Sequence, residues 1–310
     1  HSHPKVVAAI QQQAATLATV APSHANLQRG EAAKRIVEKA GPGFAKVFFT
    51  NGGADAIENA IRMARLTTRK HKVISTFRSY HGNTGAAIAA TGDWRRMPNE
   101  YAWGHLRVFG PFLYRSEFHA TTEAEECERA LQHLERTIQA EGPDTIAAMV
   151  LESVPGTAGI FAPPAGYLAG VRRIADKYNI VWIADEVMAG FGRTGEWFAW
   201  QGESVNPEGV VPDLIAFAKG VNSGYVPVGG VVISPEIAAA FDDEARIIAS
   251  LQHPNVVRVF DTERAYGTRF IVMELLEGEV LETALANQPR MPWPRIKRIL
   301  KESLLALQHV

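Results

Sequence analysis

Three side chains of this sequence, Asp185, Val187 and Lys219, have the types and the spacing for acid–base and amine chemistry. Asp185 and Glu186 follow the apolar run Ile180–Ala184, whose β-branched residues indicate a short strand buried on both faces. Because side chains alternate along a strand, Asp185 and Val187 should point one way while Glu186 points the other. One face of this strand end therefore carries a carboxylate beside a branched aliphatic side chain.

Lys219 follows a second apolar run, Leu214–Ala218, and leads into the glycine-rich segment Gly220–Gly230. Glycine lets backbone and ligand approach closely, so we expect this lysine to lie away from a solvated face. Together the three side chains suit pyridoxal phosphate: Lys219 would form the Schiff base, Asp185 would keep the pyridine nitrogen protonated, and Val187 would pack on the ring. The alternative is that Asp185 caps the next segment and Lys219 is an ordinary surface lysine.

The motifs around these residues resemble a known family. The sequence DEVMAGFGRTG (185–195), followed by FAKG (217–220), is similar to the class III aminotransferases, which are dimeric enzymes of the pyridoxal phosphate fold type I. The resemblance implies an α/β fold with a mostly parallel sheet, catalytic roles for Lys219 and Asp185, and a cofactor contact for Val187. It also implies a homodimer that takes a small-molecule amino donor and a keto-acid acceptor.

A glycine-rich turn, Asn51–Gly53, separates a predicted strand at 46–49 from a helix that should begin near Ala54. Such a turn offers backbone N–H groups and the positive end of a helix dipole, which suit a phosphate. Many α/β proteins use paired glycines only to turn the chain. The family resemblance implies that Gly53 and Ala54 contact the cofactor phosphate.

Two further segments resemble the family. Tyr80, His81 and Gly82 are similar to its aromatic-His-Gly triplet, in which the ring stacks on the cofactor opposite Val187; the alternative is a packed loop tyrosine with His81 merely hydrogen-bonded. Glu152, at the end of a strand predicted over 146–151, matches an acid that we expect near Asp185 and the cofactor ring.

The sequence departs from the family at one position, and two other stretches indicate a substrate class. A second glutamate, which some members use to mask an arginine and so accommodate two substrates, is replaced by Thr157, so the resemblance does not extend to that switch. The stretches FGPFLYRS and VPGTAG are most similar to enzymes that act on ω-amino acids such as taurine or β-alanine.

The remaining elements must position these residues. Strands predicted over 72–76, 146–151 and 214–218 alternate with helices, which is typical of a parallel sheet with its site at the carboxyl edge. The segment 91–119 reads as irregular and aromatic. Helices are expected over 4–20, 28–40, from about 54, 123–140 and 165–178.

Composition limits the function classes. The chain has 310 residues, 46% apolar and 21% charged, and a net charge of -1, so no overall charge favours nucleic acid or a membrane surface. The single Cys127 fits a reducing compartment, and no apolar run or signal peptide indicates a membrane, so we expect the cytoplasm. We predict no metal site. Because residues 1–4 lack an initiator methionine and soon enter a helical pattern, we expect that an upstream portion is absent.

The character of the sequence changes after about residue 241. Residues 242–310 resemble part of the α+β amino-terminal lobe of a bacterial Hanks-type serine/threonine kinase, with Glu244 at the helix C position, His253–Asn255 before the fourth strand, and Phe270–Gly278 as the fifth strand and hinge. The glycine-rich loop, strand lysine, catalytic aspartate and metal ligands of kinase chemistry are absent from 242–310. We therefore interpret this tail as a kinase-like fragment without activity.

The sequence predicts two parts: an aminotransferase core over 1–241, incomplete at both ends, and the kinase-like fragment over 242–310. The predicted function is transfer of an amino group from an amine or ω-amino acid to a keto acid. Two alternatives stay open: a non-catalytic protein whose tail binds a partner, and a fusion of two incomplete domains with no native function.

Overall fold

The computed structural model describes residues 1–20, 24–99, 102–241, 259–265, 268–273 and 292–309. Its contacts divide the chain into two compact units. One unit is Ala32–Phe241, and the other combines His1–Glu31 with Asp242–Val310. The first unit holds every residue that the sequence predicts to contact a cofactor.

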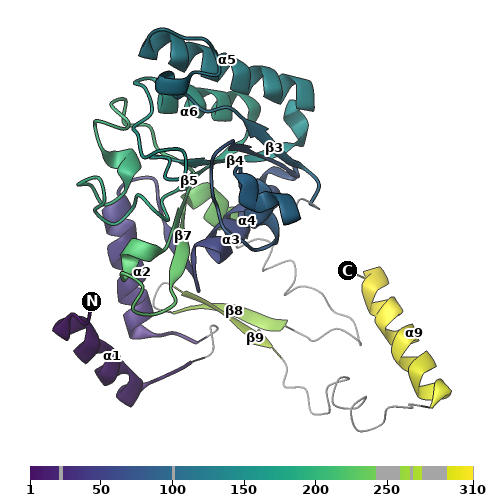
Figure 1. The fold of residues 1–310 in the computed structure, drawn as a ribbon. Coiled ribbons are helices and arrows are strands. Elements are labelled where there is room, and N and C mark those ends of the chain that lie inside the picture. Colours follow the sequence, from purple (N-terminus) through teal and green to yellow (C-terminus); the bar gives the residue numbers. More distant parts are fainter. Residues whose placement is uncertain (21–23, 100–101, 242–258, 266–267, 274–291, 310) are drawn as a thin grey trace. The chain divides into compact units, whose positions relative to one another are not determined.

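A seven-stranded sheet forms the centre of the unit Ala32–Phe241 (Figure 1). Its strands lie in the order β1-β7-β6-β5-β4-β2-β3, and all neighbouring pairs are parallel except the two that involve β7. The carboxyl ends of the six other strands therefore meet at one edge. The strands are β1 (Lys46–Thr50), β2 (Lys72–Thr76), β3 (His105–Val108), β4 (Ile146–Glu152), β5 (Val181–Asp185), β6 (Leu214–Phe217) and β7 (Gly229–Ile233).

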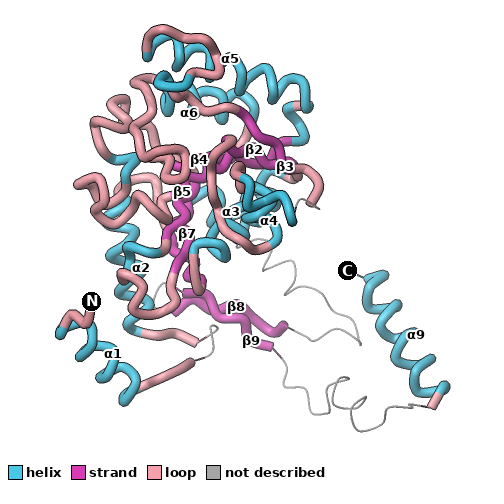
Figure 2. Tube along the Cα trace, in the orientation of Figure 1, coloured by secondary structure: helices cyan, strands magenta, loops and turns pink. Residues whose placement is uncertain are grey.

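Helices cover both faces of this sheet, as Figure 2 shows in cyan against magenta strands. Helices α3 (Gly53–Thr68) and α4 (Gly85–Ala90) pack on the face that carries Val181 and Ile183 of β5. Helices α5 (Glu123–Glu141) and α6 (Tyr167–Tyr178) pack on the opposite face against Trp182. On that second face, Ile36 and Ala40 of α2 (Leu27–Ala40) also belong to the buried core. The layers are thus helix, sheet, helix, the architecture that alternating strands and helices predict.

Local sequence explains several element ends. Helix α5 begins after Thr122, whose hydroxyl accepts a hydrogen bond from the Glu125 N–H at 3.2 Å, and acidic residues fill its first turn. Helix α6 lies between Gly166 and Asn179, both with left-handed backbone. The predicted strands and helices of this unit are confirmed to within a few residues.

Two parts of the sequence prediction were wrong. The segment 91–119 is not wholly irregular, because it contains β3 and two 3₁₀ helices, η1 (Trp94–Asn99) and η2 (Leu113–Arg115). Strand β3 escaped prediction because it has only four residues and only the last of them, Val108, is fully buried. Strand β7 lies where the sequence indicated only a glycine-rich segment. Further 3₁₀ helices are η3 (Pro143–Thr145), η4 (Ala199–Gln201) and η5 (Lys219–Val221).

The other unit contains helix α1 (Pro4–Thr16), which ends earlier than predicted, and an antiparallel hairpin of β8 (Val259–Ala265) and β9 (Thr268–Met273). Helix α9 (Trp293–His309) follows. The predicted positions Glu244 and His253–Asn255, and the part of Phe270–Gly278 beyond Met273, lie outside the described residues. No helix in the described ranges has both the length and the hydropathy needed to cross a membrane.

Candidate active site

Two acidic residues and the segment before Lys219 lie side by side at the carboxyl edge of the sheet. Glu152 of β4 pairs in register with Asp185 of β5, and Asp185 pairs with Ala216 of β6. By strand alternation, both carboxylates point to the face that α3 and α4 cover. Lys219 follows β6 by two residues, opens η5 with a left-handed φ of 27°, and is exposed, contrary to the expectation of a lysine away from solvent.

Asp185 forms a buried pair with His81. Its Oδ2 lies 2.6 Å from Nδ1 of His81, both side chains are buried, and its Oδ1 accepts a hydrogen bond from the Val187 N–H at 3.0 Å. Burial alone would lower the pKa of His81, but the hydrogen bond and charge of Asp185, with the charge of Glu152, outweigh it and raise that pKa. Asp185 therefore stabilises the protonated form of His81 relative to a histidine in water.

Glu186 points to the other side of the strand, as the sequence predicts. Its buried carboxylate accepts hydrogen bonds from the N–H groups of Ala199 at 2.8 Å and Trp200 at 3.1 Å. Burial raises its pKa against these hydrogen bonds. This carboxylate is therefore a structural anchor for the segment 199–200 and not a partner of Asp185.

Glu152 ties two loops to the sheet edge. Its Oε2 accepts a hydrogen bond from the Gly156 N–H at 2.9 Å, and its Oε1 lies 3.4 Å from the Tyr80 N. Burial raises the pKa of Glu152, the charge of His81 opposes this, and the charge of Asp185 adds to it. The structure thus brings Glu152, His81 and Asp185 into one electrostatic cluster, which supports the sequence expectation that Glu152 lies near Asp185.

Tyr80 is half-buried, and an arginine covers one face of its ring. The guanidinium carbon of Arg95 lies 3.8 Å from the ring centroid, within the range of a cation–π contact. Arg95 also forms a forked pair with Asp93, with Nε 2.8 Å from Oδ2. Sequence reasoning missed Arg95. The Asp93-x-Arg95 spacing was its only signal, since nothing local shows that this segment folds back over Tyr80.

The start of helix α3 packs tightly against the strand that ends in Asp185. A Cβ on Gly53 would lie 2.7 Å from Cγ1 of Val187, so no larger side chain fits there. A Cβ on Gly82 would lie 2.6 Å from Cβ of Ala54, so the loop after β2 also meets this helix start. Gly53, Ala54 and Val187 are therefore neighbours, as the sequence predicts for a phosphate cradle beside a ring.

The N–H groups at the start of α3 are suited to an anion. The first intrahelical hydrogen bond runs from the Ala56 N–H to the Gly52 carbonyl at 3.0 Å, so the N–H groups of Gly53 and Ala54 come before it. Asp185, His81, Tyr80 and Val187 approach from the neighbouring strand ends. A pyridine bearing a phosphate fits this set, because one end needs N–H donors and the other an acid.

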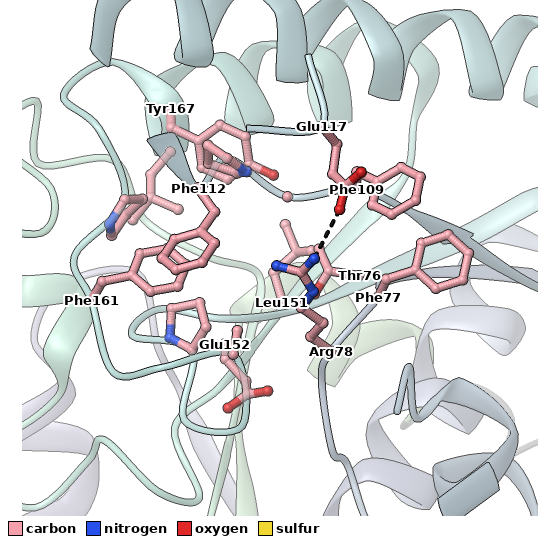
Figure 3. A pocket seen from close by; sticks show the side chains of 16 residues that line it. Thr76, Phe77, Arg78, Phe109, Phe112, Glu117, Leu151, Glu152, Phe161 and Tyr167 are labelled. Carbon is pink, nitrogen blue, oxygen red and sulfur yellow. Dashed lines mark hydrogen bonds and ion pairs between the residues drawn. The ribbon is translucent and has the colours of Figure 1, made fainter. Parts of the chain in front are cut away.

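An aromatic pocket lies next to Glu152, between the loops that follow β2, β3 and β4 (Figure 3). Its lining includes Phe112 and Phe161, which stack with ring centroids 4.8 Å apart. Arg78 and Glu117 form an ion pair in it, with N–O 2.8 Å. The pocket is mostly apolar and holds one charged pair.

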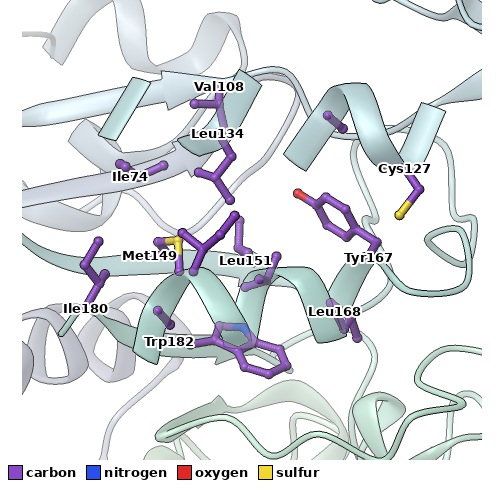
Figure 4. Packing of buried hydrophobic residues seen from close by; sticks show 14 of the residues in the cluster. Ile74, Val108, Cys127, Leu134, Met149, Leu151, Tyr167, Leu168, Ile180 and Trp182 are labelled. Atoms are coloured by element: carbon purple, nitrogen blue, oxygen red, sulfur yellow. The ribbon is translucent and has the colours of Figure 1, made fainter. Parts of the chain in front are cut away.

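The inner wall of this pocket belongs to the core beneath α5 and α6. Leu151, Tyr167 and Leu168 line the pocket and also pack with Met149 and Trp182 (Figure 4). The close packing of this core limits how far the wall can move. This inner wall of the pocket is therefore supported by the core.

Comparison with known proteins assigns the fold and the family. The model of the aminotransferase class-III family matches residues 1–246. The chain is 37% identical over 227 residues to diaminobutyrate–2-oxoglutarate transaminase of Halomonas elongata, covering 69% of this chain and 47% of that protein. It is 35% identical over 219 residues to hypotaurine/taurine–pyruvate aminotransferase of Paracoccus denitrificans, covering 68% and 46%.

Solved structures give the same result. Taurine:2-oxoglutarate aminotransferase from Bifidobacterium kashiwanohense, in complex with PLP and glutamate, matches with a TM-score of 0.74 and 46% identity over 78% of this chain and 55% of that one. The ω-transaminase of Pseudomonas jessenii in complex with PMP matches with a TM-score of 0.75 and 32% identity, covering 81% and 57%. The chain spans about half the length of the relatives it matches. On the match over residues 1–246, the chain belongs to the class III aminotransferase family.

Proposed function

We propose that this chain forms the pyridoxal phosphate-binding core of a transaminase that moves an amino group from an amine or ω-amino acid to a keto acid. The observation that carries the proposal is the buried Asp185–His81 pair, 2.6 Å apart, at the sheet edge where Lys219 follows the neighbouring strand. The family assignment supports the same activity.

The proposed roles follow from the contacts. Gly53 and Ala54 would hold the phosphate through their N–H groups, and Lys219 would hold the cofactor covalently. Val187 and Tyr80 would pack on opposite faces of the ring. Asp185 would bind the pyridine nitrogen, and His81 with Glu152 would fix the position and charge of Asp185.

When bound, pyridoxal phosphate supplies an electron sink for the carbon that loses its proton. Asp185 would support that role by placing its carboxylate beside the ring nitrogen, and the buried contact with His81 would hold that carboxylate in position. Lys219, once released, would take the proton from the substrate carbon and return it at the cofactor. Lys219 is exposed at its position after β6, which leaves its amine free to move between the substrate carbon and the cofactor.

An ω-amino acid is the proposed donor. Similar proteins include one named for hypotaurine and taurine with pyruvate, and one named for taurine with 2-oxoglutarate. The sequence stretches FGPFLYRS and VPGTAG support the same substrate class, and both contribute residues to the aromatic pocket. We also propose a cytoplasmic homodimer, supported by the family resemblance and by the single buried Cys127.

For residues 242–310 we propose a separate kinase-like fragment, giving a boundary near residue 241. The support is that hairpin β8–β9 lies where that resemblance predicts strands four and five, with β9 overlapping the start of Phe270–Gly278.

The test of the enzyme proposal is chemical attachment. The chain is incubated with pyridoxal phosphate, reduced with borohydride and digested, and we expect the cofactor on the Lys219 peptide alone, with Lys219→Arg as the control that loses it. With taurine or β-alanine and a keto acid, Asp185→Asn should slow transamination by about a hundredfold, because the charge at the ring nitrogen is lost. Label on another lysine, or an unchanged rate in Asp185→Asn, would contradict the assigned roles.

A further inference from the structure

Arg95 occupies one face of the Tyr80 ring, so the proposed site leaves only the other face for a cofactor. The guanidinium of Arg95 lies 3.8 Å from the centroid of Tyr80, close enough that no second group fits between them. Tyr80 is also held through its backbone, whose N–H faces Oε1 of Glu152 at 3.4 Å. A cofactor ring can therefore meet Tyr80 only on the face away from Arg95.

Arg95 is itself held in place by its near neighbour Asp93 and by the loop after β4. Its Nε lies 2.8 Å from Oδ2 and 3.1 Å from Oδ1 of Asp93, and its Nη2 lies 3.4 Å from Oγ1 of Thr157 in the loop after β4. Asp93 is largely buried and its N–H donates to the Ser79 carbonyl at 3.1 Å. The guanidinium thus joins the loop of Tyr80, the start of η1 and the loop after β4.

The chemistry of this contact requires arginine. A guanidinium is planar, so it can lie flat on a ring while its edge makes a forked pair with a carboxylate, whereas a lysine ammonium is a point charge that cannot do both. The carboxylate of Asp93 offsets the charge of Arg95. Tyr80 is therefore stacked without adding net positive charge near a protonated pyridine.

We propose that Arg95, held by Asp93, is a positioning residue that fixes the Tyr80 ring for stacking on the cofactor. This role rests on the proposed function, since it assumes that Tyr80 packs on pyridoxal phosphate. A ring that is already ordered loses less rotamer freedom when the cofactor binds, so the contact raises cofactor affinity through preorganisation. Arg95 itself does not touch the cofactor.

The test is a double-mutant cycle on cofactor affinity in the full chain, measured as the dissociation constant of pyridoxal phosphate by absorbance titration. Arg95→Gln should raise that constant roughly threefold to tenfold, the range expected for losing one ordered side chain. Arg95→Lys keeps the positive charge and the aliphatic part of the side chain, and it should raise the dissociation constant by a similar factor. This variant tests the proposal even if Arg95→Gln folds poorly. In a Tyr80→Leu background, Arg95→Gln should have no further effect, because the ring it positions is gone.

Arg96→Gln is the matched control. Arg96 lies next to Arg95 in η1, but its Nη1 donates to the carbonyls of Gly92 and Asp93 and not to the ring of Tyr80. Its loss should leave the dissociation constant unchanged. A second readout needs no cofactor: fluorotyrosine at position 80 should change its ¹⁹F resonance in Arg95→Gln and not in Arg96→Gln.

The outcomes separate the two proposals. A parent chain that binds no pyridoxal phosphate would overturn the proposed function, and with it the role of Arg95. A parent that binds, with an unchanged constant in Arg95→Gln and Arg95→Lys, would overturn the role of Arg95 alone. The role of Arg95 would also be overturned if Arg95→Gln weakened cofactor binding equally with and without the Tyr80 ring. The same holds if Arg96→Gln weakened cofactor binding as much as Arg95→Gln.

Discussion

The contact between Gly53 and Val187 predicts a specific coupling between helix α3 and strand β5. A methyl group on Gly53 would lie 2.7 Å from Cγ1 and 3.0 Å from Cγ2 of Val187, where carbon atoms normally stay about 3.5–4.0 Å apart. Val187 is β-branched and therefore stiff, and its N–H is bonded to Asp185. Gly53→Ala must push one of these segments away from the other.

The expected cost can be bounded from two opposing effects. Overpacking a close contact typically costs about 1–3 kcal/mol, whereas alanine gains at most about 1 kcal/mol over glycine in a helix. These effects leave a net destabilisation by Gly53→Ala between about 0 and 3 kcal/mol, and we expect about 1–2 kcal/mol, the middle of that range. For a unit of this size, that lowers the melting temperature by about 2–8 °C.

Urea unfolding of four proteins measures this coupling: the parent, Gly53→Ala, Val187→Ala and the double variant, followed by the fluorescence of the buried Trp182 and Trp200. In Val187→Ala the two γ-carbons are gone, and the remaining Cβ lies 3.5 Å from the new methyl group, an ordinary contact. We expect Gly53→Ala to cost little in that background. If it costs the same with and without the γ-carbons of Val187, the close packing of α3 on β5 is refuted.

Two other predictions concern pH and nucleotide. Burial, with the charges of Arg65 and Arg107, lowers the pKa of His105 from 6.5 to about 4, so the unfolded chain binds more protons between these values; this contribution to stability is complete above pH 6.5 and lost as the pH falls toward 4. The free energy of unfolding, measured with urea, should fall from pH 7 to pH 5 by about 1–2 kcal/mol more in the parent than in His105→Gln. An equal fall in both proteins would contradict the assignment. Because residues 242–310 lack the phosphate-binding loop and metal ligands of kinases, millimolar magnesium ATP should leave the melting temperature unchanged, and a clear rise would show that the tail binds nucleotide.

The sequence predicts those parts of the fold that depend on local pattern. Continuous apolar runs predict β4, β5 and β6, and alternation predicts that Asp185 and Glu186 have different partners, as the structure shows. Strand β3 was missed because its HLRV sequence alternates polar and apolar side chains over only four residues, which is the lower limit for recognising a strand. Strand β7 was missed because paired glycines open it.

The site residues were predicted through family likeness, but their pairing was not. The hydrogen bond between His81 and Asp185 joins residues 104 positions apart in the sequence, and it exists because β2 and β5 lie on either side of β4. The cover of Tyr80 by Arg95 depends on how the segment after α4 folds back, which no periodicity encodes. Sheet order and loop path are tertiary properties, so residue types alone do not specify them.

The reversed strand β7 has a consequence for the order in which the protein is built. Strand β1 joins the sheet only through β7, where Lys46 pairs with Ile233 and Thr50 with Gly229. During synthesis β1 therefore cannot pair with β7 until residues 229–233 have been made. Contacts between such distant parts of a chain form slowly. Gly53 begins its helix directly after β1, so the proposed phosphate-binding end of the site should be completed after Asp185 and Lys219 have been made. A ribosome-bound chain that stops short of Gly229 would expose an unpaired strand edge, which is the state in which chaperones are most needed.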